Sequence, residues 1–92
     1  MQANTIQVRK VMHNAITAHD ARVARWYGTL GSWTEKTSKR NVKRRSVVYI
    51  IDSSKADRVL MQVQNEFDVL GYENKVKTTS DGMYLRCIAD IV

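Results

Sequence analysis

The chain has 92 residues, 43% of them apolar and 26% charged, a composition that fits one small globular domain and excludes a multidomain protein. Fifteen lysines and arginines against nine acids give a net charge of +6, which favours a polyanionic partner. The single cysteine excludes an internal disulfide and a thiol-based zinc site. No apolar run has the roughly 18 residues of a membrane span, so we expect a cytoplasmic protein without a membrane partner, or a nuclear one in a eukaryote.

The first 35 residues predict a helical N-terminal segment. Apolar side chains recur near helical spacing between Val8 and Trp33, after a candidate N-cap at Asn4. The pattern fits one long helix or a helix pair broken at a glycine within residues 28–31. A rival interpretation makes residues 5–11 a strand, because apolar and polar side chains also alternate there.

Residues 36–45 form a basic block that contains no acid, and we expect it to be a linker. Like charges at this density repel one another until a polyanion neutralises them. Each cation that meets a phosphate releases counterions, so the block predicts binding to DNA or RNA that is dominated by phosphate contacts and weakly sequence-specific. The alternative is a solvated linker without a partner. The cations of the block are Lys36, Lys39, Arg40, Lys43, Arg44 and Arg45.

Residues 46–92 predict a β-α-β-β unit. The run 46–52 is β-branched, aromatic and apolar, which is typical of a strand covered on both faces. Ser54 and Asp57 resemble a capping box at the start of a helix. The apolar residues that follow recur at steps of three and four, and Gly71 is placed where a left-handed C-terminal cap belongs.

Asp81-Gly82 is typical of a type I′ hairpin turn, because both central residues need positive φ. A two-residue turn here pairs Val76 with Cys87 on the core side and Lys77 with Arg86 on the other side. A right-handed crossover then lets the last strand lie between the first two, as in the half-unit of ferredoxin-like folds. We therefore predict one α+β domain, with the helical segment 1–35 and the linker 36–45 preceding a three-stranded sheet.

The outer face of the hairpin is the second candidate site, with Tyr84 among Lys75, Lys77 and Arg86. Sheets that bind single-stranded RNA combine an aromatic ring for base stacking with cations for the backbone. The alternative is that the N-terminal helix packs on this face and buries Tyr84. The predicted cationic footprint also includes Arg22 and Arg25.

A cluster of aromatic residues supports a second function of a different class. Trp26, Tyr27 and Trp33 lie close together in the sequence beside basic residues. Such side chains often anchor protein interfaces. The chain would then be a small regulator or inhibitor, of the type encoded by phages, that docks on an acidic surface of a larger protein. The structural alternative places the three rings in the core.

We expect no catalytic site, metal or cofactor. His13 and His19 are six residues apart, so on a helix they point in different directions, and no further ligands complete a metal site. Cys87 belongs to the predicted core face and is therefore a poor partner for a Cys-His pair. Strand 46–52 is an almost uncharged sheet edge, and we expect the N-terminal segment or a second copy in a homodimer to cover it.

Overall fold

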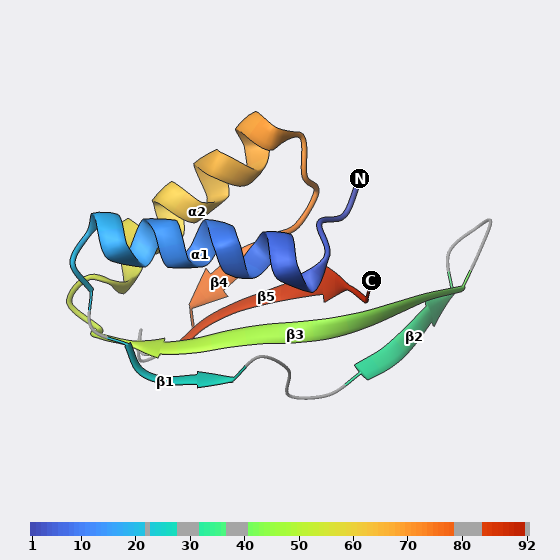
Figure 1. The fold of residues 1–92 in the computed structure, drawn as a ribbon, viewed down its shortest axis with the longest axis horizontal. Helices are drawn as coiled ribbons and strands as arrows, with labels where there is room; N and C mark the ends of the chain where they lie inside the picture. The colour runs from blue at the N-terminus through green and yellow to red at the C-terminus, as the bar shows by residue number, and fades with distance from the viewer. Residues whose placement is uncertain (22, 28–31, 37–40, 79–83, 92) are drawn as a thin grey trace.

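The computed structural model describes residues 1–21, 23–27, 32–36, 41–78 and 84–91 and shows an α+β fold with helices on one side of a sheet (Figure 1). This confirms the predicted class, with an N-terminal helix followed by a β-α-β-β unit. The elements are α1 (Thr5–Ala18), β1 (Val23–Tyr27), β2 (Ser32–Lys36), β3 (Asn41–Ile51), α2 (Ala56–Leu70), β4 (Val76–Thr78) and β5 (Tyr84–Asp90).

The β-α-β-β unit has the predicted topology. β5 lies between β3 and β4 and is antiparallel to both. Val76 pairs with Cys87 and Lys77 pairs with Arg86, which is the register expected from a two-residue turn at Asp81-Gly82. The turn itself lies outside the described residues. Because the register is as predicted, the predicted core and outer faces of the hairpin are also the observed ones.

The prediction of helix through residue 35 is wrong beyond α1, and the rival strand at residues 5–11 is wrong as well. Residues 23–27 and 32–36 are strands β1 and β2, and both pair antiparallel with β3. Helix α1 ends at Ala18, and Asp20 has a φ of 50°, in the left-handed region that aspartate tolerates. The chain thus leaves the helix without the glycine or proline that marks most helix ends.

Strands β1 and β2 cover the edge of β3 that the sequence left open. β1 pairs with the C-terminal part of β3, and β2 pairs with residues 41–45. The predicted linker 36–45 is therefore partly strand, since Lys36 ends β2 and Asn41–Arg45 open β3. A homodimer formed by pairing at this edge of β3 would have to displace β1 and β2.

We call β2 and residues 41–45 the β2–β3 ribbon. Its two strands pair without interruption from Ser32 opposite Arg45 to Lys36 opposite Asn41. At the inner end of the ribbon, Arg44 and Arg45 also pair with Asp90 and Ala89 of β5. The outer end extends beyond the helices and the chain termini (Figure 1).

Both helices pack on the same face of the sheet and share one core. Tyr49, Leu85 and Cys87 are each fully buried on this face, beneath Met12 of α1 and Phe67 of α2. Asn4 caps α1 as predicted, in a capping box with Gln7. The core residues with the lowest exposure are Ala3, Val8, Met12, Ala15, Val47, Tyr49, Ala56, Val59, Val63, Phe67, Leu85, Cys87 and Ala89.

Helix α2 ends as predicted but begins differently. Gly71 adopts a φ of 77°, the left-handed conformation of a C-cap. The N-cap is Lys55, which makes no capping bond through its side chain, so the predicted box of Ser54 and Asp57 is wrong. The Ser54 hydroxyl instead donates to Asp52 Oδ1 at 2.8 Å, because that carboxylate follows the strand directly and closes the turn before the helix.

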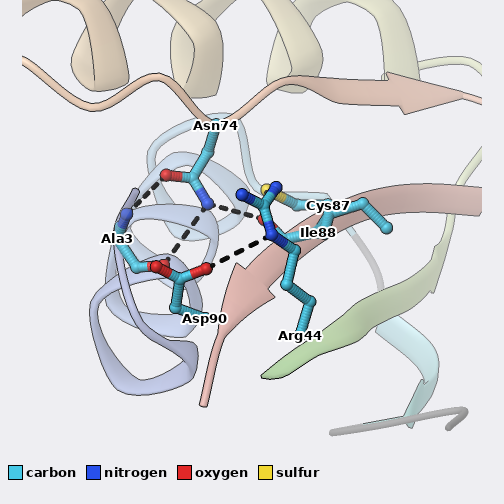
Figure 2. A network of polar contacts seen from close by, with 6 residues as sticks. All are labelled: Ala3, Arg44, Asn74, Cys87, Ile88 and Asp90. Carbon is cyan, nitrogen blue, oxygen red and sulfur yellow. Dashed lines mark hydrogen bonds and ion pairs between the residues drawn. The ribbon is translucent and has the colours of Figure 1, made fainter. Parts of the chain in front are cut away.

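Asn74 joins the N-terminal residues to the sheet (Figure 2). Its side-chain oxygen accepts a hydrogen bond from the Ala3 amide at 2.6 Å, and its Nδ2 donates to the carbonyl oxygens of Ile88 at 2.6 Å and Ala3 at 3.4 Å. The Ala3 carbonyl also accepts from the Asp90 amide at 3.1 Å. Asn74 is 1% exposed, and these bonds satisfy a buried amide that would otherwise be costly.

Candidate functional site

The sheet face opposite the two helices is the main candidate site, and we call it the open sheet face. Because α1 and α2 share the other face, no described helix covers it (Figure 1). The alternative in which the N-terminal helix buries Tyr84 is therefore wrong. Strand alternation and pairing place on it the described side chains of Arg44, Ser46, Val48, Ile50, Lys75, Lys77, Tyr84, Arg86, Ile88 and Asp90, of which Ser46 and Val48 are buried at 2% exposure. The register also puts Arg25, Tyr27, Trp33 and Glu35 at positions of this face.

Three exposed cations lie on the open sheet face. Lys77 is the direct neighbour of Arg86 across the β4–β5 ladder, and Lys75 precedes β4 on the same side. None of the three forms an ion pair with a described residue. Like charges placed directly opposite each other in a ladder are destabilising, and an anion bound between them would remove that repulsion.

The guanidinium of Arg86 is held against the sheet by Ser46. Arg86 Nη2 donates to Ser46 Oγ at 3.0 Å, and Nε lies 3.3 Å from the same oxygen. Ser46 is 2% exposed, so this acceptor is fixed within β3. The arginine side chain is therefore oriented before any ligand arrives, and most of its donors remain unused.

Apolar side chains flank the Lys77–Arg86 pair along β5. Ile50 pairs with Tyr84, and both are half-buried, as is Ile88 farther along β5. Sequence analysis did not assign Ser46 or Ile50 to this face. The run 46–52 is so uniformly apolar that it shows no alternation, and only the pairing of β3 with β5 reveals which side chains share a face.

Arg44 has a structural role that the sequence did not suggest. It pairs with Asp90 in the register of β3 and β5, and its Nε lies 3.6 Å from Asp90 Oδ1 (Figure 2). The two side chains are 17% and 19% exposed. One cation of the predicted block is therefore neutralised by the protein's own acid.

The strand pleat divides the other described cations of the block between two sides. Lys43 and Arg45 are exposed and alternate with Arg44 along β3. Arg45 pairs with Ala89, whose side chain is in the core, so Arg45 is on the helix side of the sheet, at the inner end of the ribbon. The block is thus not one continuous surface.

The remaining predicted site residues are placed through the backbone or lie outside the described part. Arg25, Trp26 and Tyr27 belong to β1, opposite Ile50, Tyr49 and Val48. Trp33 belongs to β2, opposite Arg44, and Lys36 ends that strand opposite Asn41. Arg22, Lys39 and Arg40 lie outside the described residues, and docking through the aromatic cluster stays a prediction.

Helix α2 concentrates three acids away from the open sheet face. It carries Asp57, Glu66 and Asp68 against a single cation, Arg58, and it packs on the opposite side of the sheet. Helix α1, on the same side as α2, carries the cations Arg9 and Lys10 and no acid.

Two shallow hollows between the helices are the other candidate cavities. They have volumes of about 390 and 360 Å³, and Asn14, Glu66 and Leu70 line both. Leu70 and Val69 are exposed at the rim. The described walls hold one carboxylate and no histidine or cysteine, so this groove does not resemble an acid-base or metal site.

The cysteine and the histidine that sequence analysis considered for catalysis have different surroundings. Cys87 is fully buried, as predicted, and desolvation raises the pKa of its thiol to about 12 despite a hydrogen bond with Asn74. His13 is on α1 with its ring edge-to-face against Tyr49, at a centroid distance of 5.3 Å. The described residues contain no cluster of ligands suited to a metal ion.

Comparison with protein-family models, with curated proteins and with solved structures finds no match to this chain. Neither α1 nor α2 combines the length and apolar character that a membrane-crossing helix needs.

Proposed function

We propose that the protein is a small nucleic-acid-binding module whose contacts are mainly with phosphates and only weakly dependent on base sequence. The observation that carries this proposal is the open sheet face, where Lys75, Lys77 and Arg86 are exposed without an acidic partner among the described residues. Neutralising such a cluster releases counterions from a polyanion, which supplies affinity without sequence information. As part of the proposal the protein acts in the cytoplasm, or in the nucleus of a eukaryotic cell.

The β2–β3 ribbon carries a second group of cations on the helix side of the sheet, opposite the open sheet face. Lys43 and Arg45 are exposed there, and Arg45 pairs with Ala89 of β5. Nucleic acid that wraps around the edge of the ribbon would meet these two side chains, whereas Arg44 would contribute little because Asp90 neutralises it. The proposed contacts are therefore Lys43, Arg45, Lys75, Lys77 and Arg86, without Arg44.

A salt titration of fluorescence anisotropy tests the proposal. A labelled oligonucleotide is bound at salt concentrations from about 50 to about 200 mM. With three to five phosphate contacts, log K should fall against log salt with a slope of roughly −2 to −4. Lys77→Gln should weaken binding and make the slope about one unit shallower.

Lys10→Gln is the matched control, because Lys10 is an exposed cation on α1, which packs on the other side of the sheet. It removes the same charge and should leave the slope nearly unchanged. Binding that does not depend on salt would contradict the proposal. Equal losses from the two variants would also contradict it, because only net charge would then matter and not the open sheet face.

A further inference from the structure

We infer that the open sheet face binds single-stranded nucleic acid and discriminates against the duplex, with Tyr84 as the stacking platform. The inference rests on the proposed function and specifies its ligand. It is carried by one juxtaposition, in which the half-buried apolar side chains of Tyr84, Ile50 and Ile88 adjoin the exposed cations Lys77 and Arg86 on a face that no described helix covers.

The apolar part of this face decides between the two forms of nucleic acid. A duplex turns its phosphates outward and keeps its bases stacked on one another. Its phosphates can therefore bind cations, but its base faces are not accessible to an aromatic ring. A single strand exposes the faces of its bases, which stack on aromatic side chains largely irrespective of base identity. Only a single strand therefore exposes base faces that can stack on Tyr84 beside Ile50.

The cations are placed to bind the backbone of a strand whose base lies on Tyr84. Arg86 is two residues from Tyr84 along β5, so both are on the same face, and Lys77 is directly opposite Arg86 on β4. The Ser46 hydroxyl holds the guanidinium against the sheet at 3.0 Å. A phosphate between Lys77 and Arg86 would relieve their repulsion while the adjoining base stacks on the ring.

The test compares a labelled single strand with the duplex of the same mixed sequence. A length of about 16 nucleotides is the upper end of the site sizes of a single-strand-binding β-barrel domain. At equal salt, the natural protein should bind the single strand roughly tenfold more tightly. Tyr84→Leu should remove most of that preference, about a tenfold loss on the single strand, and leave duplex binding unchanged. Tyr84→Phe, which keeps the ring, should retain the preference.

A second measurement uses the natural protein, so the result does not depend on how well a variant folds. Amide chemical shifts are followed as the unlabelled single strand is added. The inference expects the largest changes at Tyr84, Arg86 and Ile88 of β5 and at Lys77 of β4. Changes confined to α1 and α2 would overturn it.

The outcomes separate this inference from the proposed function. Salt-dependent binding of both forms with equal affinity, unaffected by Tyr84→Leu, would overturn the single-strand inference and leave the proposed function standing. Absence of salt-dependent binding to either form would overturn both. A preference for the single strand that Tyr84→Leu abolishes and Tyr84→Phe preserves supports the inference.

Discussion

Lys77 and Arg86 are direct neighbours across the β4–β5 ladder, and both side chains are exposed on the open sheet face. Opposite charges at such a cross-strand pair stabilise a sheet, whereas two cations destabilise it. Arg86 is further restrained by its bonds to Ser46, so it is not simply a solvated side chain. An anion bound between the two side chains, as the proposed function requires, would relieve this local cost to stability.

Removing one charge of this pair should raise stability and lower affinity together. We expect Lys77→Gln to increase the free energy of unfolding by about 0.5 kcal/mol at low salt, because the cross-strand repulsion disappears. The gain should shrink at high salt, where exposed charges are screened. Urea unfolding at two salt concentrations measures it. Lys75→Gln is the control, since Lys75 precedes the ladder and should lose affinity without gaining stability. A destabilised Lys77→Gln would contradict the repulsion argument.

The two neighbouring arginines of β3 should respond in opposite ways. Arg44→Gln leaves the largely buried carboxylate of Asp90 without its ion pair, so we expect a loss of about 1–2 kcal/mol in stability and a small effect on oligonucleotide binding. Arg45→Gln should change stability by less than about 0.5 kcal/mol, because its side chain is exposed, and should weaken binding. Urea unfolding of both variants measures the change in stability, and fluorescence anisotropy measures the change in oligonucleotide binding. Equal stability losses would show that the Arg44–Asp90 pair contributes nothing.

Asn74→Ala should be the most destabilising of the polar substitutions considered. It removes the acceptor of the Ala3 amide and the donor to the Ile88 carbonyl, both at 2.6 Å in a site that is 1% exposed. Buried groups left without partners cost about 1–3 kcal/mol each, and we expect a total loss near the upper end of that range. Gln64→Ala, which removes longer and less buried bonds to residues 74 and 76, should cost less. Urea unfolding ranks the two variants, and the reverse order would contradict the network.

The thiol of Cys87 predicts a loss of stability at alkaline pH. Its pKa is raised by burial from 9.0 to about 12 in the folded chain, so above pH 9 the unfolded chain loses a proton that the folded chain retains. Stability is therefore complete below pH 9 and falls as the pH rises towards 12, by at most about 1.4 kcal/mol per unit. Urea unfolding between pH 8 and pH 10.5 should show a steeper decline for the natural protein than for Cys87→Ala. Parallel declines would mean that the buried thiol is not responsible.

The β-α-β-β unit was predictable because its signals are local. The register of β4 and β5 follows from the Asp81-Gly82 dipeptide and a period of two, and the left-handed cap at Gly71 follows from the last apolar residue of α2. The net charge follows from the residue counts, and the cations of the hairpin follow from the residues at positions 75, 77 and 86. Each of these features depends on residues a few positions apart.

Strands β1 and β2 depended on a partner far along the chain. Val23, Trp26 and Trp33 have a spacing that mimics a helix, yet β-branched and aromatic side chains also favour strands, and the unpaired edge of β3 offers their backbone its hydrogen bonds. The edge of β3 needed a pairing partner, and residues 23–36 had a composition typical of strands. Together these two facts were the evidence in the sequence for β1 and β2.

The make-up of the proposed binding surface was likewise decided by packing between residues far apart in the sequence. Which face α1 covers depends on the shared core of Met12 with Phe67 and Leu85, and no local pattern encodes that choice. The pairing of β3 with β5 brings Ser46 to Arg86 and Arg44 to Asp90, which assigns two basic side chains to different roles. Charge is a property of composition, but its neutralisation and exposure depend on which residues meet in space.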